Sequence, residues 1–200
     1  MTTPLIAPLE LQIEPTSRTP IGGASVSSGR VTAAIRGLCA PSKSVTHHNW
    51  LSAVARLVTD MRPDLSAQLQ SHLGVDPSAH NLLANLSMGE IGVVYEALVA
   101  LSDHRSRREK GQYFTPDDVA KFMAEQASRF PQGHWLDPCC GVGNLSFHLA
   151  RTMEDPGKFV AHNLTLIDMD PIALRSAIAI LIANFAAHDD HQALPALVGR

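Results

Sequence analysis

The 200-residue sequence has few cysteines, no large excess of one charge and no long apolar run, and each shortage excludes a class of protein. No stretch reaches the roughly 18 uncharged apolar residues that a membrane-spanning helix needs. The three cysteines, Cys39, Cys139 and Cys140, are an odd number with two adjacent, which is unlike a disulfide framework. The first residues also lack the basic start and apolar core of a secretory signal, so we expect a soluble, cytoplasmic protein without membrane contact.

Charge and histidine patterns argue against two further kinds of site. The chain has sixteen basic and nineteen acidic residues and thus a formal charge of -3. It therefore lacks the net positive charge with which a protein holds DNA through its phosphates. The metal-ligand spacings CxxC and HxxxH are absent, and the histidine pairs at 47–48 and 188–191 lie among residues typical of helix ends and loops. We therefore expect no metal site.

Three segments with different patterns divide the chain. Residues 1–30 carry prolines and a Gly/Ser-rich run without a sustained period, which predicts a flexible N-terminal arm. Residues 31–103 repeat apolar side chains at helical spacing, also around 82–86, with glycine or proline at the joints, which predicts a helical domain. The last helix of this domain opens at Ser87-Met-Gly-Glu90, a capping-box pattern.

Residues 104–200 change to an alternation of strands and helices. After the GQYFTP segment we expect a helix up to Phe130, with Thr115 as its cap and Pro116 in its first position. The strands are expected at 134–136 and 164–167, and the helices that follow them at 144–153 and 171–185. This β-α-β-α order is typical of the opening of a parallel, doubly wound sheet, and a further apolar run at 196–198 is a candidate third strand.

The segment Trp135–Asn144 ends a strand at Asp137 and turns through Gly141 and Gly143 into a helix. Glycines let a ligand approach the backbone closely, and α/β sheets bind nucleotide-like ligands in this crevice at the carboxyl end of a strand. The pattern differs from the phosphate fingerprint GxGxxG, because Ser146 stands in the place of the third glycine. An acid beside the ligand disfavours a pyrophosphate and favours a cationic or hydroxyl-bearing group.

A second acid, Asp168, closes the second strand in the segment Leu164–Pro171. A carboxylate at this place can accept hydrogen bonds from both ribose hydroxyls of an adenosine group, and Met169 is expected to lie against the adenine ring. Asp137 suits a sulfonium and an amino group. Together the two acids and the glycine turn predict a site for S-adenosylmethionine.

These motifs, GQYFTP, then DPCCGVGN, then a strand ending in an acid before Asp-Pro, resemble those of the N6-adenine DNA methyltransferases of restriction-modification systems. The likeness covers about residues 87–185. It extends in particular to type I methylation subunits and fused type II enzymes, which also carry a helical domain ahead of the catalytic one. The resemblance implies an α/β protein, with an all-helical N-terminal domain before the first strands and helices of an incomplete Rossmann-like methyltransferase sheet.

The resemblance also implies roles for individual residues. The segment that closes over the methionine end of the cofactor would comprise Tyr113, Phe114, Thr115 and Pro116. The cofactor loop would comprise Asp137, Pro138, Cys139, Gly141, Gly143 and Asn144. Asp168 would hold the ribose, although the family more often has glutamate there. Because Cys139 and Cys140 stand where the family has small residues, we expect both to be packing residues.

The catalytic tetrapeptide of this family, [Asn/Asp]-Pro-Pro-[Tyr/Phe], does not occur in the 200 residues. Its groups hold a flipped-out adenine in line with the methyl group. We therefore expect a chain that binds S-adenosylmethionine, is inactive alone and contacts DNA only within a complete enzyme. The short sheet would expose an apolar strand edge and one side of two helices, including 172–185, so we expect a second polypeptide or a C-terminal region to complete it.

Several alternatives stay open at this point. The chain fits a fragment of a larger methyltransferase, the first half of a two-chain enzyme, or a truncated descendant with a binding role, in a restriction-modification or phage-defence system. A different function is a non-catalytic protein-interaction module with a vestigial cofactor crevice. The basic residues Arg105, Arg107, Arg108 and Lys110 fit either contacts with DNA phosphates or a solvated hinge between domains.

Overall fold

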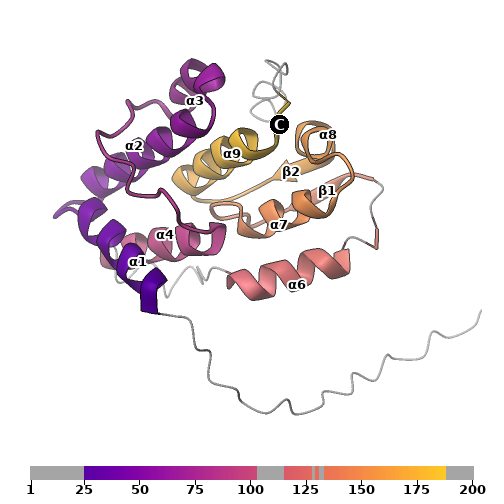
Figure 1. Ribbon diagram of the computed structural model, residues 1–200, viewed down its shortest axis with the longest axis horizontal. Coiled ribbons are helices and arrows are strands. Elements are labelled where there is room, and N and C mark those ends of the chain that lie inside the picture. Colours follow the sequence, from indigo (N-terminus) through magenta and orange to yellow (C-terminus); the bar gives the residue numbers. More distant parts are fainter. Residues whose placement is uncertain (1–24, 103–114, 128, 131–132, 188–200) are drawn as a thin grey trace, which may run out of the picture.

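The computed structural model describes residues 25–102, 115–127, 129–130 and 133–187, most of which are helical (Figure 1). In chain order the elements are α1 (Ser25–Leu38), α2 (Lys43–Met61), the 3-10 turn η1 (Pro63–Leu65), α3 (Ser66–Leu73), α4 (Met88–Ser102), α6 (Asp117–Ala127), β1 (Trp135–Asp137), α7 (Asn144–Thr152), α8 (Pro156–Lys158), the π-helical turn η2 (Phe159–Asn163), β2 (Leu164–Leu166) and α9 (Pro171–Phe185). The first 24 residues of the expected arm, the basic residues at 105–110 and the apolar run at 196–198 lie outside the described residues.

Helix α1 begins inside the segment expected to be a flexible arm. It starts at Ser25, and Gly29 lies within it. Ala34 and Leu38 are buried in the core beside α4. This packing offsets the roughly 1 kcal/mol that a glycine costs inside a helix, so the expectation of an arm was wrong for residues 25–30.

Local signals explain where α4 begins and why the segment before it is not helical. The Glu90 amide donates to Ser87 Oγ at 3.2 Å, and the Ser87 amide donates to Glu90 Oε2 at 2.7 Å, which confirms the capping box. The helical spacing expected around residues 82–86 was wrong, because these residues form turns. Asn85 has a φ of 59°, which interrupts a right-handed helix, although Leu83 is fully buried.

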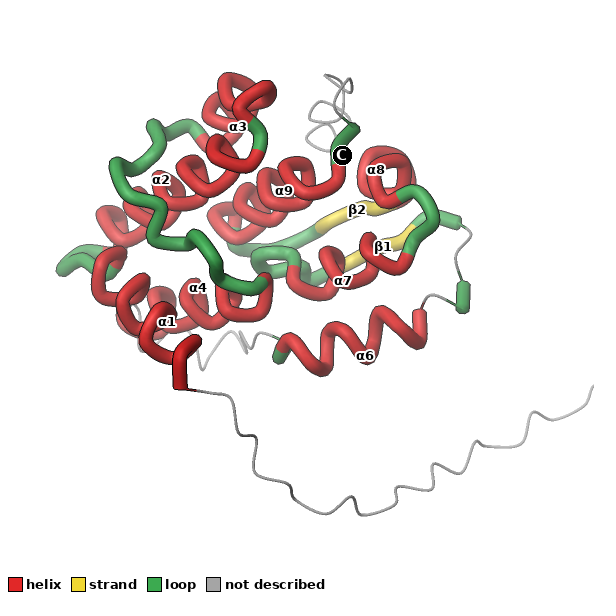
Figure 2. Tube along the Cα trace, viewed as in Figure 1, coloured by secondary structure: helices red, strands yellow, loops and turns green. Residues whose placement is uncertain are grey.

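Strands β1 and β2 form a parallel two-stranded sheet, in which Trp135 pairs with Leu164 and Asp137 with Leu166. Helix α7 lies between the two strands in the chain, so the segment is a β-α-β unit. Both strands, α7 and α9 lie within one residue of the bounds expected from the sequence, whereas α6 ends before the expected Phe130. Because parallel strands end at the same edge of a sheet, the loops after β1 and β2 run side by side (Figure 2).

Helix α9 joins the helical part to the β-α-β unit, because it contributes to both hydrophobic cores. The larger core unites residues of α1 to α4 with Ile178, Ile180 and Ile182 of α9. The smaller core unites Leu181 of α9 with residues of α6, α7, η2 and β2. The larger core therefore includes residues from both sides of the boundary expected at 103/104.

The cover over α9 comes from the same chain. Helices α2 and α3 pack against it (Figure 1), and Trp50 Nε1 of α2 donates a hydrogen bond to Ser176 Oγ at 2.9 Å. The expectation that α9 leaves an apolar side exposed was wrong for this reason. Exposed apolar side chains lie instead on α6, at Val119, Phe122 and Met123, and at Leu136 of β1.

The helices within the described ranges include none that combines the length and the apolar character needed to cross a membrane. Cys39, Cys139 and Cys140 are free thiols.

Candidate functional site

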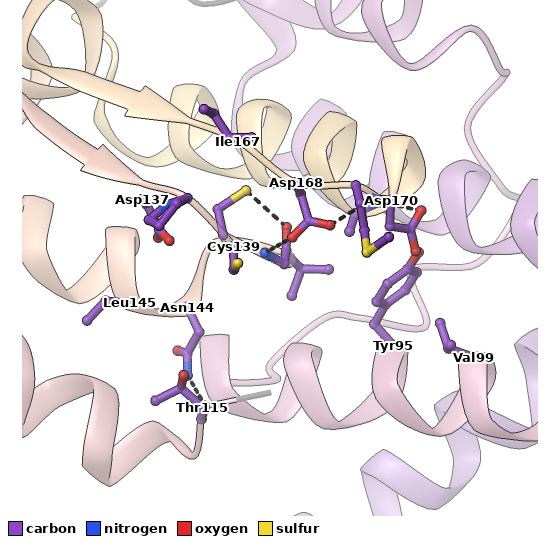
Figure 3. A pocket seen from close by; sticks show the side chains of 16 residues that line it. Tyr95, Val99, Thr115, Asp137, Cys139, Asn144, Leu145, Ile167, Asp168 and Asp170 are labelled. Atoms are coloured by element: carbon purple, nitrogen blue, oxygen red, sulfur yellow. Dashed lines mark hydrogen bonds between the residues drawn. The ribbon is translucent and has the colours of Figure 1, made fainter. Parts of the chain in front are cut away.

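A cavity of about 390 Å³ lies at the edge of the sheet where the loops leave β1 and β2 (Figure 3). Residues 138–142 come from the loop after β1, and 167–170 from the loop after β2. Side chains of α4, α7 and α9 and the residue Thr115 ahead of α6 complete the wall. The volume falls within the range of sites for small ligands and cofactors.

Backbone hydrogen bonds hold the two loops together and continue the sheet. The Ile167 amide donates to the Asp137 carbonyl at 2.9 Å, and the Cys140 amide donates to the Ile167 carbonyl at 3.0 Å. Gly141 and Gly143 then turn the chain into α7 with φ values of 54° and 93°. These left-handed conformations favour glycine and explain why both positions of the turn carry it.

Both carboxylate oxygens of Asp168 accept a backbone hydrogen bond, one from the loop after β1 and one from its own loop after β2. Oδ2 accepts a hydrogen bond from the Gly141 amide at 2.7 Å, and Oδ1 accepts one from the Asp170 amide at 2.8 Å. Each carboxylate oxygen has two lone pairs and so keeps a further acceptor position. Asp168 therefore fixes the loops against each other and still offers acceptors at the cavity wall.

Asp170 joins the cavity to the helical part of the molecule. Its Oδ1 accepts from the Ile172 amide at 2.9 Å and caps α9, and its Oδ2 accepts from the Tyr95 hydroxyl at 2.6 Å. The Tyr95 ring packs on Trp50 of α2 with 4.8 Å between centroids. Burial, and then the neighbouring carboxylate of Asp170, raise the pKa of Tyr95, so its hydroxyl stays protonated and donates.

Asp137 and Asn144 stand at the two ends of the glycine loop. Asp137 Oδ2 accepts from the Ser146 hydroxyl at 2.6 Å, which orients the carboxylate. Asn144 Nδ2 donates to the Thr115 carbonyl at 2.9 Å and ties the segment ahead of α6 to α7. Asn144 Oδ1 is buried and has no hydrogen-bond partner among the described residues.

The charges around the cavity have one sign. Asp137, Asp168 and Asp170 line it, whereas its described lining holds no lysine, arginine or histidine. Such a wall attracts cations and repels phosphate groups. Within the described residues, no group of three or more histidine, cysteine, aspartate or glutamate side chains is placed to hold a metal ion.

The two adjacent cysteines lie in different environments. Cys140 is buried, and burial, followed by the charge of Asp137, raises the pKa of its thiol. The expectation of a packing residue is confirmed for Cys140. It was wrong for Cys139, which is exposed and lines the cavity, because the turn after Pro138 directs the two side chains to different surroundings.

The cavity brings together most of the residues expected from the sequence. Those that line it are Thr115, Asp137, Pro138, Cys139, Gly141, Asn144, Asp168 and Met169. Gly143 shapes the turn and Pro116 precedes α6, but neither lines the cavity. Tyr113 and Phe114 lie outside the described residues. The Met169 side chain is 70% exposed.

Sequence reasoning missed the contribution of α4 and of the start of α9. The additional lining residues are Tyr95, Val99, Cys140, Val142, Leu145, Ile167, Asp170 and Ala173. Asp170 carried a usable signal, because an aspartate before a proline at a helix start is a typical cap. Tyr95 carried none, since nothing local relates it to a residue 75 positions away.

A comparison with protein-family models matches residues 87–182 to a family described as N-6 DNA methylase. The matched range begins just before α4 and ends within α9, so it includes every residue that lines the cavity. Neither the curated proteins nor the solved structures include a significant match to the chain.

Proposed function

Residues 87–182 of this chain belong to the N-6 DNA methylase family, and from this premise we propose that the cavity binds S-adenosylmethionine for methylation of adenine N6 in DNA. When bound, this cofactor supplies an electrophilic methyl group on a positively charged sulfur. The observation that carries the proposal is a cavity of cofactor size lined by three carboxylates and, in its described part, by no basic side chain. That wall suits a sulfonium and an ammonium group and disfavours ATP or a nicotinamide dinucleotide.

Particular residues suit particular parts of the cofactor. Asp168 keeps acceptor positions for the ribose hydroxyls, and the exposed thioether of Met169 is available to lie against adenine. Asp137, at the other strand end, has one oxygen without a hydrogen-bond partner among the described residues and would face the cationic end. The positive φ of Gly141 keeps a side chain out of the loop, which lets the backbone approach the ligand.

We further propose that the groups that hold the target adenine come from a polypeptide segment outside these 200 residues, because the [Asn/Asp]-Pro-Pro-[Tyr/Phe] tetrapeptide is absent from them. On this proposal the chain alone transfers no methyl group, and DNA is engaged only in the complete enzyme. A restriction-modification or phage-defence system in the cytoplasm is the setting that the family resemblance favours. A second polypeptide or a further region would extend the sheet beyond β1 and β2.

A second candidate function is a non-catalytic interaction module with a vestigial crevice. The observation that favours it is the group of exposed apolar side chains on α6, namely Val119, Phe122 and Met123. The two functions differ in whether the cavity binds the cofactor.

Calorimetric titration of the full 200-residue chain with S-adenosylmethionine tests the proposal. We expect micromolar binding, which Asp168→Ala weakens about 10- to 150-fold, the scale of a charge-assisted hydrogen bond. Glu154→Ala is the matched control, since it removes one acid that does not line the cavity and should leave the affinity unchanged. Equal binding of ATP, or no binding of S-adenosylmethionine by the folded chain, would reject the cofactor site and favour the interaction module.

A further inference from the structure

Two side chains of α7 hold the chain at the start of α6. Asn144 Nδ2 donates to the Thr115 carbonyl at 2.9 Å. His148 Nε2 donates to Asp117 Oδ1 at 2.8 Å, because an ionised carboxylate can only accept. Asn144 and His148 are four residues apart, so they lie on the same face of α7. Residues 115–117 are therefore attached to α7 at two points, one through the main chain and one through a side chain.

The hydrogen bond between His148 and Asp117 lies outside the cavity lining. His148 is only 9% exposed and Asp117 is half-buried, and neither residue lines the cavity. Thr115, two residues before Asp117 in the chain, does line it, and Figure 3 shows Thr115 hydrogen-bonded to Asn144. A displacement of Asp117 would therefore reach the cavity wall through Thr115.

Helix α4 also confines Asp117. Gly89 in the first turn of α4 is buried, and a Cβ placed on it would lie 2.6 Å from Asp117 Cγ and 2.7 Å from its Oδ1. Because a side chain at this position would overlap the carboxylate that His148 binds, a glycine here leaves room for the pair. Asp117 thus contacts both α4 and α7, the helices that supply Tyr95 and Asn144 to the cavity wall.

Apolar packing does not fix this end of α6. The buried residues of α6 are Ala120 and Ala124, whose small side chains let the helix pack closely on α7. They hold the helix from Ala120 onwards, whereas Thr115 and Pro116 are exposed. The polar contacts at 115 and 117 therefore determine where the start of α6 lies.

We propose that Asp117 and His148 are positioning residues of the cofactor site, because their hydrogen bond holds the start of α6, and with it Thr115, at the cavity wall. The proposal rests on the proposed function and goes beyond it by assigning a part in binding to two residues that do not line the cavity. A chain without the pair folds, but its wall at Thr115 is no longer fixed, so the folded protein binds the ligand more weakly.

Calorimetry of the full 200-residue chain with S-adenosylhomocysteine, the cofactor without its methyl group, measures the contribution of the pair. His148→Phe removes the donor and keeps an aromatic ring beside Phe147, and Asp117→Ala removes the acceptor. We expect each variant to bind on the order of tenfold more weakly, and the double variant no more weakly than either single one, since both residues act through one hydrogen bond. Asp117→Asn keeps an acceptor and His148→Gln keeps a donor, so both should retain most of the affinity.

Urea unfolding of the same variants separates positioning from a purely structural role. A structural role lowers the free energy of unfolding but leaves the Kd of the folded chain unchanged, and that result would overturn the proposal. Additive losses of affinity in the double variant would also overturn it, because they would show that Asp117 and His148 act independently.

Asp60→Ala is the matched control, because Asp60 also accepts hydrogen bonds from side chains, those of Arg56 and Asn81, and does not line the cavity. It should leave the affinity unchanged. If His148→Phe does not fold, the comparison of Asp117→Ala with Asp117→Asn still decides the question. If the folded wild-type chain binds no S-adenosylhomocysteine, the proposed function fails and this inference fails with it. If the wild type and all variants bind equally well, only this inference fails.

Discussion

Cys139 and Cys140 are adjacent in sequence, but the loop after β1 gives their thiols different exposure and therefore different reactivity. Cys139 is exposed at the cavity, whereas Cys140 is buried and its thiol has a raised pKa. Since the thiolate is the form that reacts with electrophiles, Cys140 is expected to be inert at neutral pH. Cys139 can therefore report on occupancy of the cavity.

In the folded chain, a maleimide should label Cys139 and the distant, exposed Cys39, but not Cys140. S-adenosylhomocysteine at about ten times its Kd should slow labelling of Cys139 about tenfold, because the occupied cavity excludes the reagent. Mass spectrometry of the digested protein follows all three thiols in one sample, with Cys39 as the internal control. Equal slowing at Cys39 and Cys139, or none at either, would contradict the placement of the ligand beside Cys139.

The acids and glycines of the site could be predicted from sequence because each has a local signal. Asp137 and Asp168 close apolar strands, and Gly141 and Gly143 separate the first strand from a helix. Tyr95 could not be predicted in this way, because its hydrogen bond to Asp170 depends on how α4 packs beside the sheet. That packing is a tertiary property with no counterpart in either local sequence.

The loop between β1 and α7 depends on close contact with α9. Gly143 has a φ of 93°, and a Cβ placed on it would lie 3.2 Å from the Ala177 Cβ. A side chain at this position therefore meets both backbone strain and a buried helix.

Gly143→Ala should lower the free energy of unfolding by about 1 to 3 kcal/mol and weaken S-adenosylhomocysteine binding by displacing the loop. Ala177→Gly removes the opposing methyl group, so the double variant should lose less stability than the sum of the two single variants. Urea unfolding of the four proteins in this cycle gives the coupling between the two positions. Strict additivity would show that the loop does not press on α9, and that backbone strain alone accounts for Gly143.

The bounds of α9 and of the start of α4 could be predicted closely because their first turns contain explicit caps. Asp170 with Pro171 starts α9, and Ser87 with Glu90 starts α4. The turns at 82–86 were missed because Asn85 takes a positive φ, which apolar spacing does not reveal. Helical periodicity identifies residues that will be buried, such as Leu83, but not the backbone conformation of the segment that carries them.

Polar contacts attach α3 of the helical part to α9. The Arg175 guanidinium donates to the carbonyls of His72 and Leu73 at the end of α3, and His72 Nε2 donates to the Arg175 carbonyl at 3.1 Å. Burial is the main cause that lowers the pKa of His72; the hydrogen bond to the Arg175 carbonyl acts against it, and the charge of Arg175 lowers the pKa further. His47 has a lowered pKa for the same primary reason, burial.

A histidine whose pKa is lower in the folded chain binds fewer protons there than in the unfolded chain, so stability rises with pH through this range. The free energy of unfolding should therefore fall as the pH is lowered from about 7.5 to about 5.5, through the ordinary histidine pKa near 6.5. His72→Gln keeps a hydrogen-bond donor and should reduce this pH dependence, as urea unfolding at the two pH values measures. An unchanged pH dependence in His72→Gln would exclude His72 as a source of it.

The sequence predicted a helical segment and a β-α-β unit but not how they share a core. The apolar residues on all sides of α9 predicted that it is buried on several sides. The pattern does not identify which other helices pack against it. The cover is α2 and α3, joined to α9 through contacts such as that of Trp50 with Ser176. Such pairings arise from shape and volume across the whole chain, which local periodicity does not encode.

The position of α9 between two cores imposes an order on folding during synthesis. Residues from Ala34 to Leu98 supply most of the larger core, but that core stays open until 171–185 have left the ribosome. The contact between Trp50 and Ser176 closes a loop of 126 positions, and such late, non-local contacts slow folding. Until then, part of the apolar face of the nascent helical segment has no partner from its own chain.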